Sequence, residues 1–120
     1  MQFFGDGDFG YTGAFIGDWA FYNNPLTAIT FNDGLQSIGS RAFYGVSVQT
    51  LSIPNSVTEL GSYAFSGCKS LETVTIGTGV TKISDYAFNT CSALTQISCP
   101  SVTEIGASAF KGCSSLTDIP

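Results

Sequence analysis

The sequence predicts a right-handed solenoid with short parallel strands on a concave face and short helical or 3₁₀ segments on a convex face. Two observations support this fold. First, each apolar segment contains two apolar residues separated by one polar residue, such as Val74 and Ile76, which is the period of a strand. Second, the dipeptide Ala-Phe recurs every 22 or 23 residues, and a fixed repeat of this length is typical of stacked coils that share one core. The repeated phenylalanines are Phe21, Phe43, Phe65, Phe88 and Phe110.

Each coil is expected to contain the same elements in the same order. Strands are expected at 26–31, 48–53, 71–76 and 94–99, followed by turns such as Pro54-Asn55 and Gly77-Thr78-Gly79. In the segment from Ile83 to Phe88, apolar residues stand four or five apart, which suits one helical turn. Glycines shortly after the repeated phenylalanine are expected to end that turn in a left-handed conformation. These glycines are Gly45, Gly67 and Gly112.

The repeat divides the chain into two parts. Residues 16–120 are expected to form about five coils, and residues 1–15 a degenerate first coil or an N-terminal cap. Stepping back 22 residues from Phe31 and Ile38 reaches Phe9 and Ile16, which places Asp6 and Asp8 opposite Ala28 and Thr30. At the other end the last copy stops partway through a strand segment without a polar cap, so the solenoid is expected to be truncated there. We therefore expect self-association through a contact near Phe110, Leu116 and Ile119.

The repeated residues resemble the BspA-like leucine-rich repeats of bacterial and protist surface proteins. The pattern is Ile-Gly-x-x-Ala-Phe-x-Gly-Cys-x-x-Leu, followed by an Ile-Pro turn and Ser-Val-Thr, and it stands almost intact in 60–76 and 105–120. The resemblance covers residues 16–120. It implies a leucine-rich-repeat solenoid and a protein-binding or adhesion module at the cell surface or in a secreted protein. No signal peptide is visible in the sequence itself.

Three cysteines occupy one slot of successive coils, at Cys68, Cys91 and Cys113. Stacking would bring them about one strand spacing apart, near enough to suggest a disulfide or a metal site. Parallel stacked side chains do not converge as a disulfide requires, and zinc needs four ligands in a chain that has no histidine. We therefore expect buried, unmodified thiols. Cys99, which replaces Ile53 and Ile76 in the pattern, is expected in the core as well.

Composition argues against several functions. Four basic and nine acidic residues give a net charge of -5, which disfavours nucleic acid and anionic membranes as partners. Without histidine a thiol nucleophile lacks its usual activating base, so we expect no enzyme and no cofactor. Asp6 and Asp8 alternate with glycines as in a calcium loop, but the remaining ligand positions are not filled, which favours a solvated acidic end coil.

Two surfaces are candidate binding sites. The slot just before Ala-Phe carries Trp19, Arg41, Tyr63, Tyr86 and Ser108, which suits either a partner contact on an aromatic stripe or edge packing between coils. By alternation, the exposed strand positions would line the concave sheet as a hydroxyl-rich, nearly uncharged surface, which fits a flat protein or glycan contact or no function at all. These positions are Ala28, Thr30, Thr50, Ser52, Thr73, Thr75, Gln96, Ser98 and Asp118.

A smaller feature is a slot of alternating charge formed by Glu59, Lys82 and Glu104, which is expected to aid the register of the coils. Taken together, these features predict a non-catalytic fragment of a larger cell-surface or secreted protein that binds a protein partner. The alternative is a spacer solenoid without a ligand of its own. A binding assay on the concave face distinguishes the two.

Overall fold

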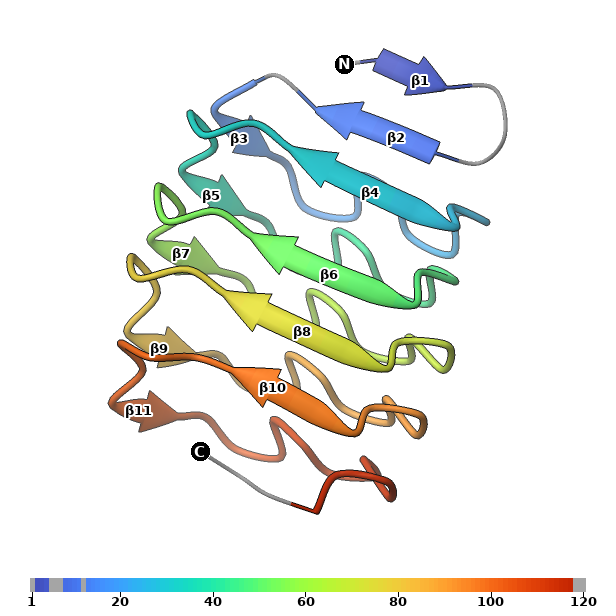
Figure 1. Cartoon of the computed structure of the whole chain (residues 1–120), viewed down its shortest axis with the longest axis vertical. Helices are drawn as coiled ribbons and strands as arrows, with labels where there is room; N and C mark the ends of the chain where they lie inside the picture. The colour runs from blue at the N-terminus through green and yellow to red at the C-terminus, as the bar shows by residue number, and fades with distance from the viewer. Residues whose placement is uncertain (1, 5–7, 12, 118–120) are drawn as a thin grey trace.

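The computed structural model describes residues 2–4, 8–11 and 13–117, with side chains described from Gly13 onward. Figure 1 shows the chain winding from the N-terminus to the C-terminus as a right-handed stack of coils, with one row of strands in front and a second row behind. The stack measures 34 × 25 × 20 Å. This arrangement confirms the predicted solenoid of parallel strands.

The front row contains the predicted strands, each shorter than expected at its start. Its members from the second coil onward are β4 (Ala28–Phe31), β6 (Thr50–Ile53), β8 (Thr73–Ile76) and β10 (Gln96–Ser98). Strand β8 pairs in parallel with β6 on one side and with β10 on the other. In this register Val74 lies between Leu51 and Ile97, so equivalent residues of successive coils are adjacent.

The rear row consists of two-residue strands, each of which ends at the apolar residue of an Ile-Gly pair or its variant. The sequence analysis did not predict these strands. They are β3 (Phe15–Ile16), β5 (Ser37–Ile38), β7 (Glu59–Leu60), β9 (Lys82–Ile83) and β11 (Glu104–Ile105). The glycine that follows four of these strands permits close approach of neighbouring coils, and Ser84 follows the fifth, β9. A Cβ at Gly61 would lie 2.4 Å from the backbone nitrogen of Ser40, so a larger residue would push the coils apart.

The expected helical or 3₁₀ segments are not confirmed. The described residues form no helix, and the Ala-Phe segments are successive turns. Their N–H groups alternate between two kinds of acceptor. The Ala20 and Tyr22 N–H groups donate within the coil to Gly17 and Trp19, whereas the Phe21 N–H donates 2.7 Å to the Ala42 carbonyl of the next coil. Half of the hydrogen bonds that a helix would keep inside the segment therefore join neighbouring coils.

The N-terminal segment departs from the predicted register. Strand β2 (Asp8–Tyr11) pairs in parallel with β4, and β1 (Gln2–Phe4) pairs antiparallel with β2. Ile16 pairs with Ile38 as predicted. Phe9, however, lies opposite Ile29 rather than Phe31, and Asp8 opposite Ala28 rather than Thr30. The reason is that the connection from the paired strand to Ile16 is two residues shorter here than in the next coil; Asp6 lies outside the described residues.

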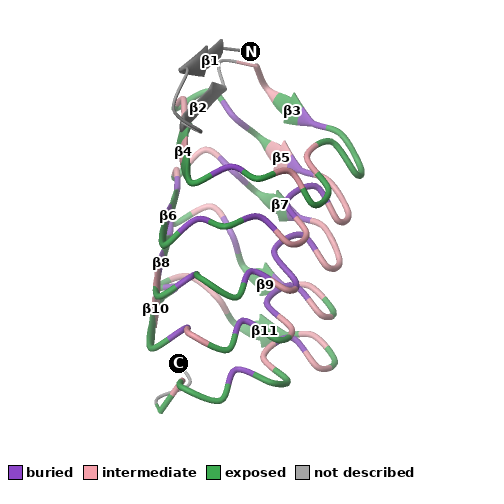
Figure 2. Ribbon diagram, turned by 90° about the vertical axis from the view of Figure 1, so that its right-hand side faces the viewer, coloured by how far each residue is buried: buried purple, intermediate pink, exposed green. Residues whose placement is uncertain are grey.

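The core lies between the two rows of strands and the turns, where Figure 2 shows the buried residues. Its centre is a column of the repeated phenylalanines. Phe43, Phe65 and Phe88 are fully buried, and the ring centroids of Phe43 and Phe65 are 5.3 Å apart with an interplanar angle of 3°. Phe21 and Phe110 extend the stack at its two ends, which confirms the predicted spine.

Candidate functional site

The predicted aromatic stripe forms a continuous ladder of side chains along the turn side of the solenoid. The guanidinium carbon of Arg41 lies 4.9 Å from the ring centroid of Trp19 and 4.1 Å from that of Tyr63. The Tyr63 and Tyr86 rings stack at 4.7 Å with an interplanar angle of 2°. Trp19 is 52% exposed and the other three residues are half-buried, so the ladder is accessible to a partner.

The backbone beneath this ladder is left-handed. Every residue of the slot has a positive φ, from 55° at Ser108 to 62° at Trp19. Each N–H in the ladder donates to a carbonyl of the next coil, as from Arg41 to Ser62 at 3.0 Å. The sequence did not reveal this conformation, because large L-residues rarely adopt it and the segment was interpreted as helical.

Two further tyrosines join the ladder near its N-terminal end. The Tyr22 ring lies 4.8 Å from the Trp19 ring and stacks on Tyr44 at 5.0 Å. Sequence reasoning missed them, although both directly follow Ala-Phe in successive coils at a spacing of 22 residues. We call the combined surface the aromatic edge. It consists of Trp19, Tyr22, Arg41, Tyr44, Tyr63 and Tyr86.

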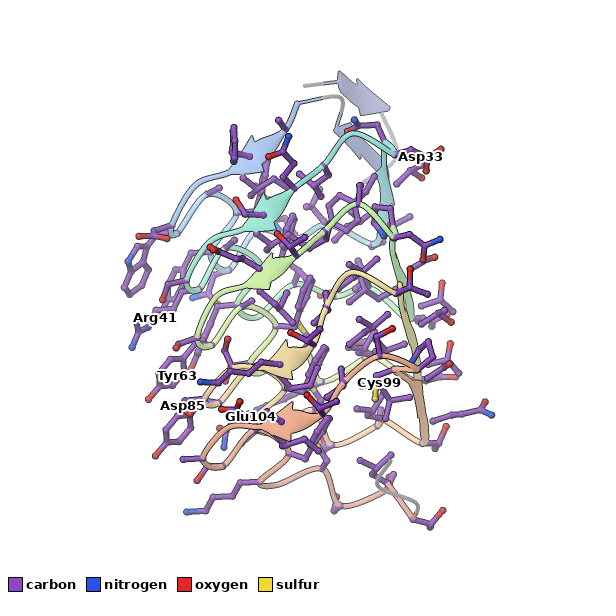
Figure 3. The ribbon with its side chains drawn as sticks, turned by 90° about the vertical axis from the view of Figure 1, so that its left-hand side faces the viewer. Asp33, Arg41, Tyr63, Asp85, Cys99 and Glu104 are labelled. Atoms are coloured by element: carbon purple, nitrogen blue, oxygen red, sulfur yellow. The ribbon has the colours of Figure 1, made fainter. Side chains whose placement is uncertain are left out.

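The carboxylates that flank the ladder in the sequence are engaged elsewhere. The Asp18 Oδ1 atom accepts the Ser40 N–H at 2.8 Å, and the Asp85 Oδ1 atom accepts the Ala107 N–H at 2.8 Å. Both acids therefore hold the coils together. Within the described part of the chain, no ion pair or hydrogen bond of the Arg41 guanidinium is found. Figure 3 shows Arg41 pointing away from the body of the protein.

The second predicted surface is the strand face, formed by the outward residues of β4, β6, β8 and β10. The register aligns Thr50 with Thr73 and Gln96, and Ser52 with Thr75 and Ser98. Only Thr73 among the described residues of this face is half-buried, and the others are exposed as predicted. Asp118 lies outside the described residues. The face thus presents short hydroxyl groups without an exposed aromatic anchor. Its described members are Ala28, Thr30, Thr50, Ser52, Thr73, Thr75, Gln96 and Ser98.

A shallow groove of about 610 Å³ follows the rear row of strands. Its walls include Phe15, which is 63% exposed, and the charged residues Asp18, Glu59 and Lys82. Much of the remaining lining is glycine and serine. The groove was not predicted, because no pattern in the sequence indicated strands that end at the apolar residue of each Ile-Gly pair.

The cysteines of the repeated slot are free, buried and in structurally equivalent positions, as predicted. Each thiol donates to the carbonyl of a repeated phenylalanine in the preceding coil: Cys68 to Phe43 at 3.3 Å, and Cys91 to Phe65 at 3.1 Å. Cys113 makes the same bond to the Phe88 carbonyl at 3.0 Å. These thiols therefore satisfy buried backbone carbonyls, a role that requires the proton.

The environment of the thiols opposes ionisation. The interaction with the Cys91 thiol and burial raise the pKa of Cys113. At Cys91, the hydrogen bond with Cys113 lowers the pKa, but the interactions with Cys68 and burial outweigh it and raise the pKa overall. Burial raises the pKa of the Cys99 thiol as well. Since thiolate is the nucleophilic and metal-binding form, this geometry disfavours both kinds of chemistry.

The charged slot is confirmed for one pair. The Lys82 Nζ atom lies 3.6 Å from Glu104 Oε2, with side chains 53% and 68% exposed. Glu59 occupies the equivalent position of β7, which lies next to β9, but among the described residues it forms no ion pair, so its contribution to the slot stays a prediction.

The described residues contain neither a metal-binding cluster nor a membrane-spanning helix. No group of three or more histidine, cysteine or acidic side chains in that part of the chain is placed to hold a metal ion. Within the same residues there is also no helix with the length and apolar character needed to cross a membrane.

Solved structures of leucine-rich repeat proteins resemble this fold. A leucine-rich repeat protein from Bacteroides ovatus is 26% identical with a TM-score of 0.66, over 92% of this chain and 36% of that one. The T. pallidum leucine rich repeat protein is 23% identical with a TM-score of 0.62, over 88% of this chain and 72% of that one. A leucine rich cell surface protein from Faecalibacterium prausnitzii is 24% identical with a TM-score of 0.57, over 94% of this chain and 48% of that one.

This chain thus spans about a third of the length of the B. ovatus protein. No curated protein sequence matches it. The pattern of the BspA type leucine rich repeat region matches residues 14–120 in six copies, which covers most of the chain. The chain therefore belongs to the BspA type leucine-rich repeat family.

Proposed function

We propose that this chain is a protein-binding module of a cell-surface or secreted protein, and that it binds its partner through the aromatic edge. The observation that carries the proposal is the ladder of accessible tryptophan, arginine and tyrosine side chains. These three residue types dominate the energetic centres of protein interfaces. The strand face, by contrast, offers serine and threonine, which contribute little binding energy as a class.

The backbone of the ladder supports a role beyond stability. A non-glycine residue in the left-handed region costs about 1–2 kcal/mol. Ring stacking and cation–π contacts return about 0.5–1.5 kcal/mol each, so the ladder contributes little net stability. A glycine would fit the same backbone without that cost. The slot four residues later carries glycine in three coils, at Gly45, Gly67 and Gly112, and Asn23 and Thr90 in the other two, whereas the ladder slot carries a large side chain in four of its five coils. Selection for binding explains why.

An array of purified secreted and cell-surface proteins tests the proposal. Three forms of the chain are compared: the native protein, an edge variant with Trp19→Ala, Tyr63→Ala and Tyr86→Ala, and a strand-face variant with Thr50→Ala, Thr75→Ala and Ser98→Ala. We expect partners that bind the native protein and the strand-face variant, but not the edge variant. Circular dichroism verifies that both variants remain folded.

Binding that is lost only in the strand-face variant would move the site to the sheet. If no partner is found for any of the three forms, the result favours a spacer solenoid. The family and the description of the F. prausnitzii structure as a cell surface protein support the proposed location. Protease treatment of intact cells that produce the full-length protein tests it, because a surface protein is cleaved while the cells remain closed.

A further inference from the structure

The centre of the aromatic edge is an arginine held between two rings. The Arg41 guanidinium lies 4.9 Å from the Trp19 ring and 4.1 Å from the Tyr63 ring, on opposite sides in the ladder. Contact with two rings restrains the guanidinium, and Figure 3 shows the side chain pointing away from the body of the protein, where its N–H donors can meet a partner. A guanidinium donates two parallel hydrogen bonds to a carboxylate, a geometry that lysine cannot provide.

We infer that Arg41 is a carboxylate-binding site, and that its ligand is an acidic side chain in an extended segment of a protein partner. The inference rests on the proposed function and names the chemistry that the aromatic edge recognises. The Asp18 and Asp85 carboxylates do not compete, because backbone N–H groups of the next coil occupy the Oδ1 atom of each. The partner carboxylate supplies the acceptor that Arg41 lacks among the described residues.

The ring orientations favour a peptide over an acidic glycan. Sugars bind aromatic side chains by stacking on ring faces, but here the facing surfaces are covered within the ladder. Arg41 covers faces of Trp19 and Tyr63, and Tyr63 and Tyr86 cover one another at 4.7 Å. A ligand at Arg41, in the middle of the ladder, therefore meets ring edges, which carry the positive part of the ring quadrupole and suit an anion.

The overall charge limits the ligand further. The chain has a net charge of -5 and only four basic residues, so a polyanion such as a sulfated glycan would be repelled over most of the surface. A single carboxylate flanked by apolar residues avoids this repulsion. Its flanks would contact Trp19 and Tyr22, which are 52% and 42% exposed.

Peptide display provides the test. A library of random dodecapeptides is selected on the immobilised native chain and depleted on the Arg41→Gln variant. Enriched peptides are then titrated in solution by isothermal titration calorimetry, a measurement that also applies to the edge variant, which lacks Trp19. Lys111→Gln is the matched control, because it removes the same charge at an exposed position three coils from Arg41. Arg41→Lys keeps the positive charge and removes the planar guanidinium that can donate two parallel hydrogen bonds.

We expect enriched peptides to contain one aspartate or glutamate beside apolar residues. Replacement of that acid by its amide should weaken binding about tenfold, as should Arg41→Gln and, to a smaller extent, Arg41→Lys. Lys111→Gln should leave affinity within about twofold. Melting curves of the Arg41 variants establish that they are folded.

Three results would overturn the inference: a lack of enrichment in acidic peptides, equal affinity for the Arg41→Gln variant, or tighter Arg41-dependent binding of an oligogalacturonate titrated in parallel. The last would identify an acidic glycan instead. These failures leave the proposed function intact when peptides still bind the native chain and not the edge variant. Peptides that bind the edge variant as well as the native chain count against both.

Discussion

The strand face and the aromatic edge are built from the same repeat, but different forces determine their residues. On the strand face, β-propensity and alternation suffice: Thr50, Thr73 and Gln96 align because their strands pair in register. At the aromatic edge the backbone disfavours the residues that occupy it, since Trp19, Arg41 and Tyr63 all have positive φ. Local preference therefore accounts for the strand face, whereas we propose that binding accounts for the residues of the aromatic edge.

The largest expected effect is the loss of stability when a core phenylalanine is removed from a turn that also carries a residue of the aromatic edge. Phe65 and Tyr63 stand two residues apart, and Phe65 is fully buried between Phe43 and Phe88. Phe65→Ala should lower the free energy of unfolding by about 3–5 kcal/mol because it leaves a cavity in the column. Urea denaturation measures the change. A loss no greater than that caused by Tyr63→Ala would show that the column is not the main support of the fold.

The buried thiols give a prediction for pH. The pKa of Cys91 is raised in the folded state, so the folded protein keeps a proton that the unfolded chain releases near pH 9. The corresponding stability is fully present below pH 9 and is lost as pH rises above it, at about 1.4 kcal/mol per pH unit for this thiol. Cys91→Ala should have a shallower slope than the native protein between pH 9 and 10.5 in urea denaturation. Parallel slopes would mean that the thiol ionises equally in both states.

Substitution of Tyr63 tests the balance between strain and stacking at the edge. Tyr63→Ala removes the stacking with Tyr86 and Arg41 but keeps a Cβ at a φ of 61°, so we expect a loss of about 1 kcal/mol. Tyr63→Gly removes the strain as well and should be at least as stable as Tyr63→Ala. Thermal melting of the two variants side by side decides the point. If the alanine variant is clearly the more stable, the backbone at this slot carries no strain.

The smallest expected effect lies at the charged pair of the rear row. Lys82 and Glu104 are largely exposed, so their attraction is worth about 0–1 kcal/mol and is screened by salt. Lys82→Glu should lower the melting temperature slightly at low ionic strength and less at high ionic strength. An unchanged melting temperature at low salt would show that the pair contributes nothing measurable to register or stability.

The sequence was sufficient to predict the solenoid, its front strands, the phenylalanine column and the stacked thiols, because each depends on a spacing that recurs in every coil. It also identified the ladder slot and the position of Arg41 between Trp19 and Tyr63. The turns were interpreted as helical because spacing alone cannot distinguish hydrogen bonds within a coil from those between coils. The left-handed backbone, the rear strands around Gly61 and the shortened first connection all depend on contacts between coils.

The roles of the two surfaces were not predictable for a different reason. Both the strand face and the ladder are regular arrays, and regularity arises from stacking whether or not a partner exists. What distinguishes them is visible only in three dimensions: the conformation of the ladder backbone and the guanidinium at its centre, which has no ion-pair partner among the described residues. The contribution of Tyr22 and Tyr44 likewise appears once the turns place them beside Trp19 and each other.

The central claim is that the aromatic edge is the binding surface, and the single tryptophan allows a direct measurement. Trp19 is 52% exposed in the free chain, so acrylamide should quench its fluorescence efficiently. Addition of a saturating partner or selected peptide should reduce the quenching constant severalfold, because the ligand covers the indole beside Arg41. An unchanged quenching constant in a complex whose formation is verified by sedimentation would place the ligand elsewhere and contradict the account.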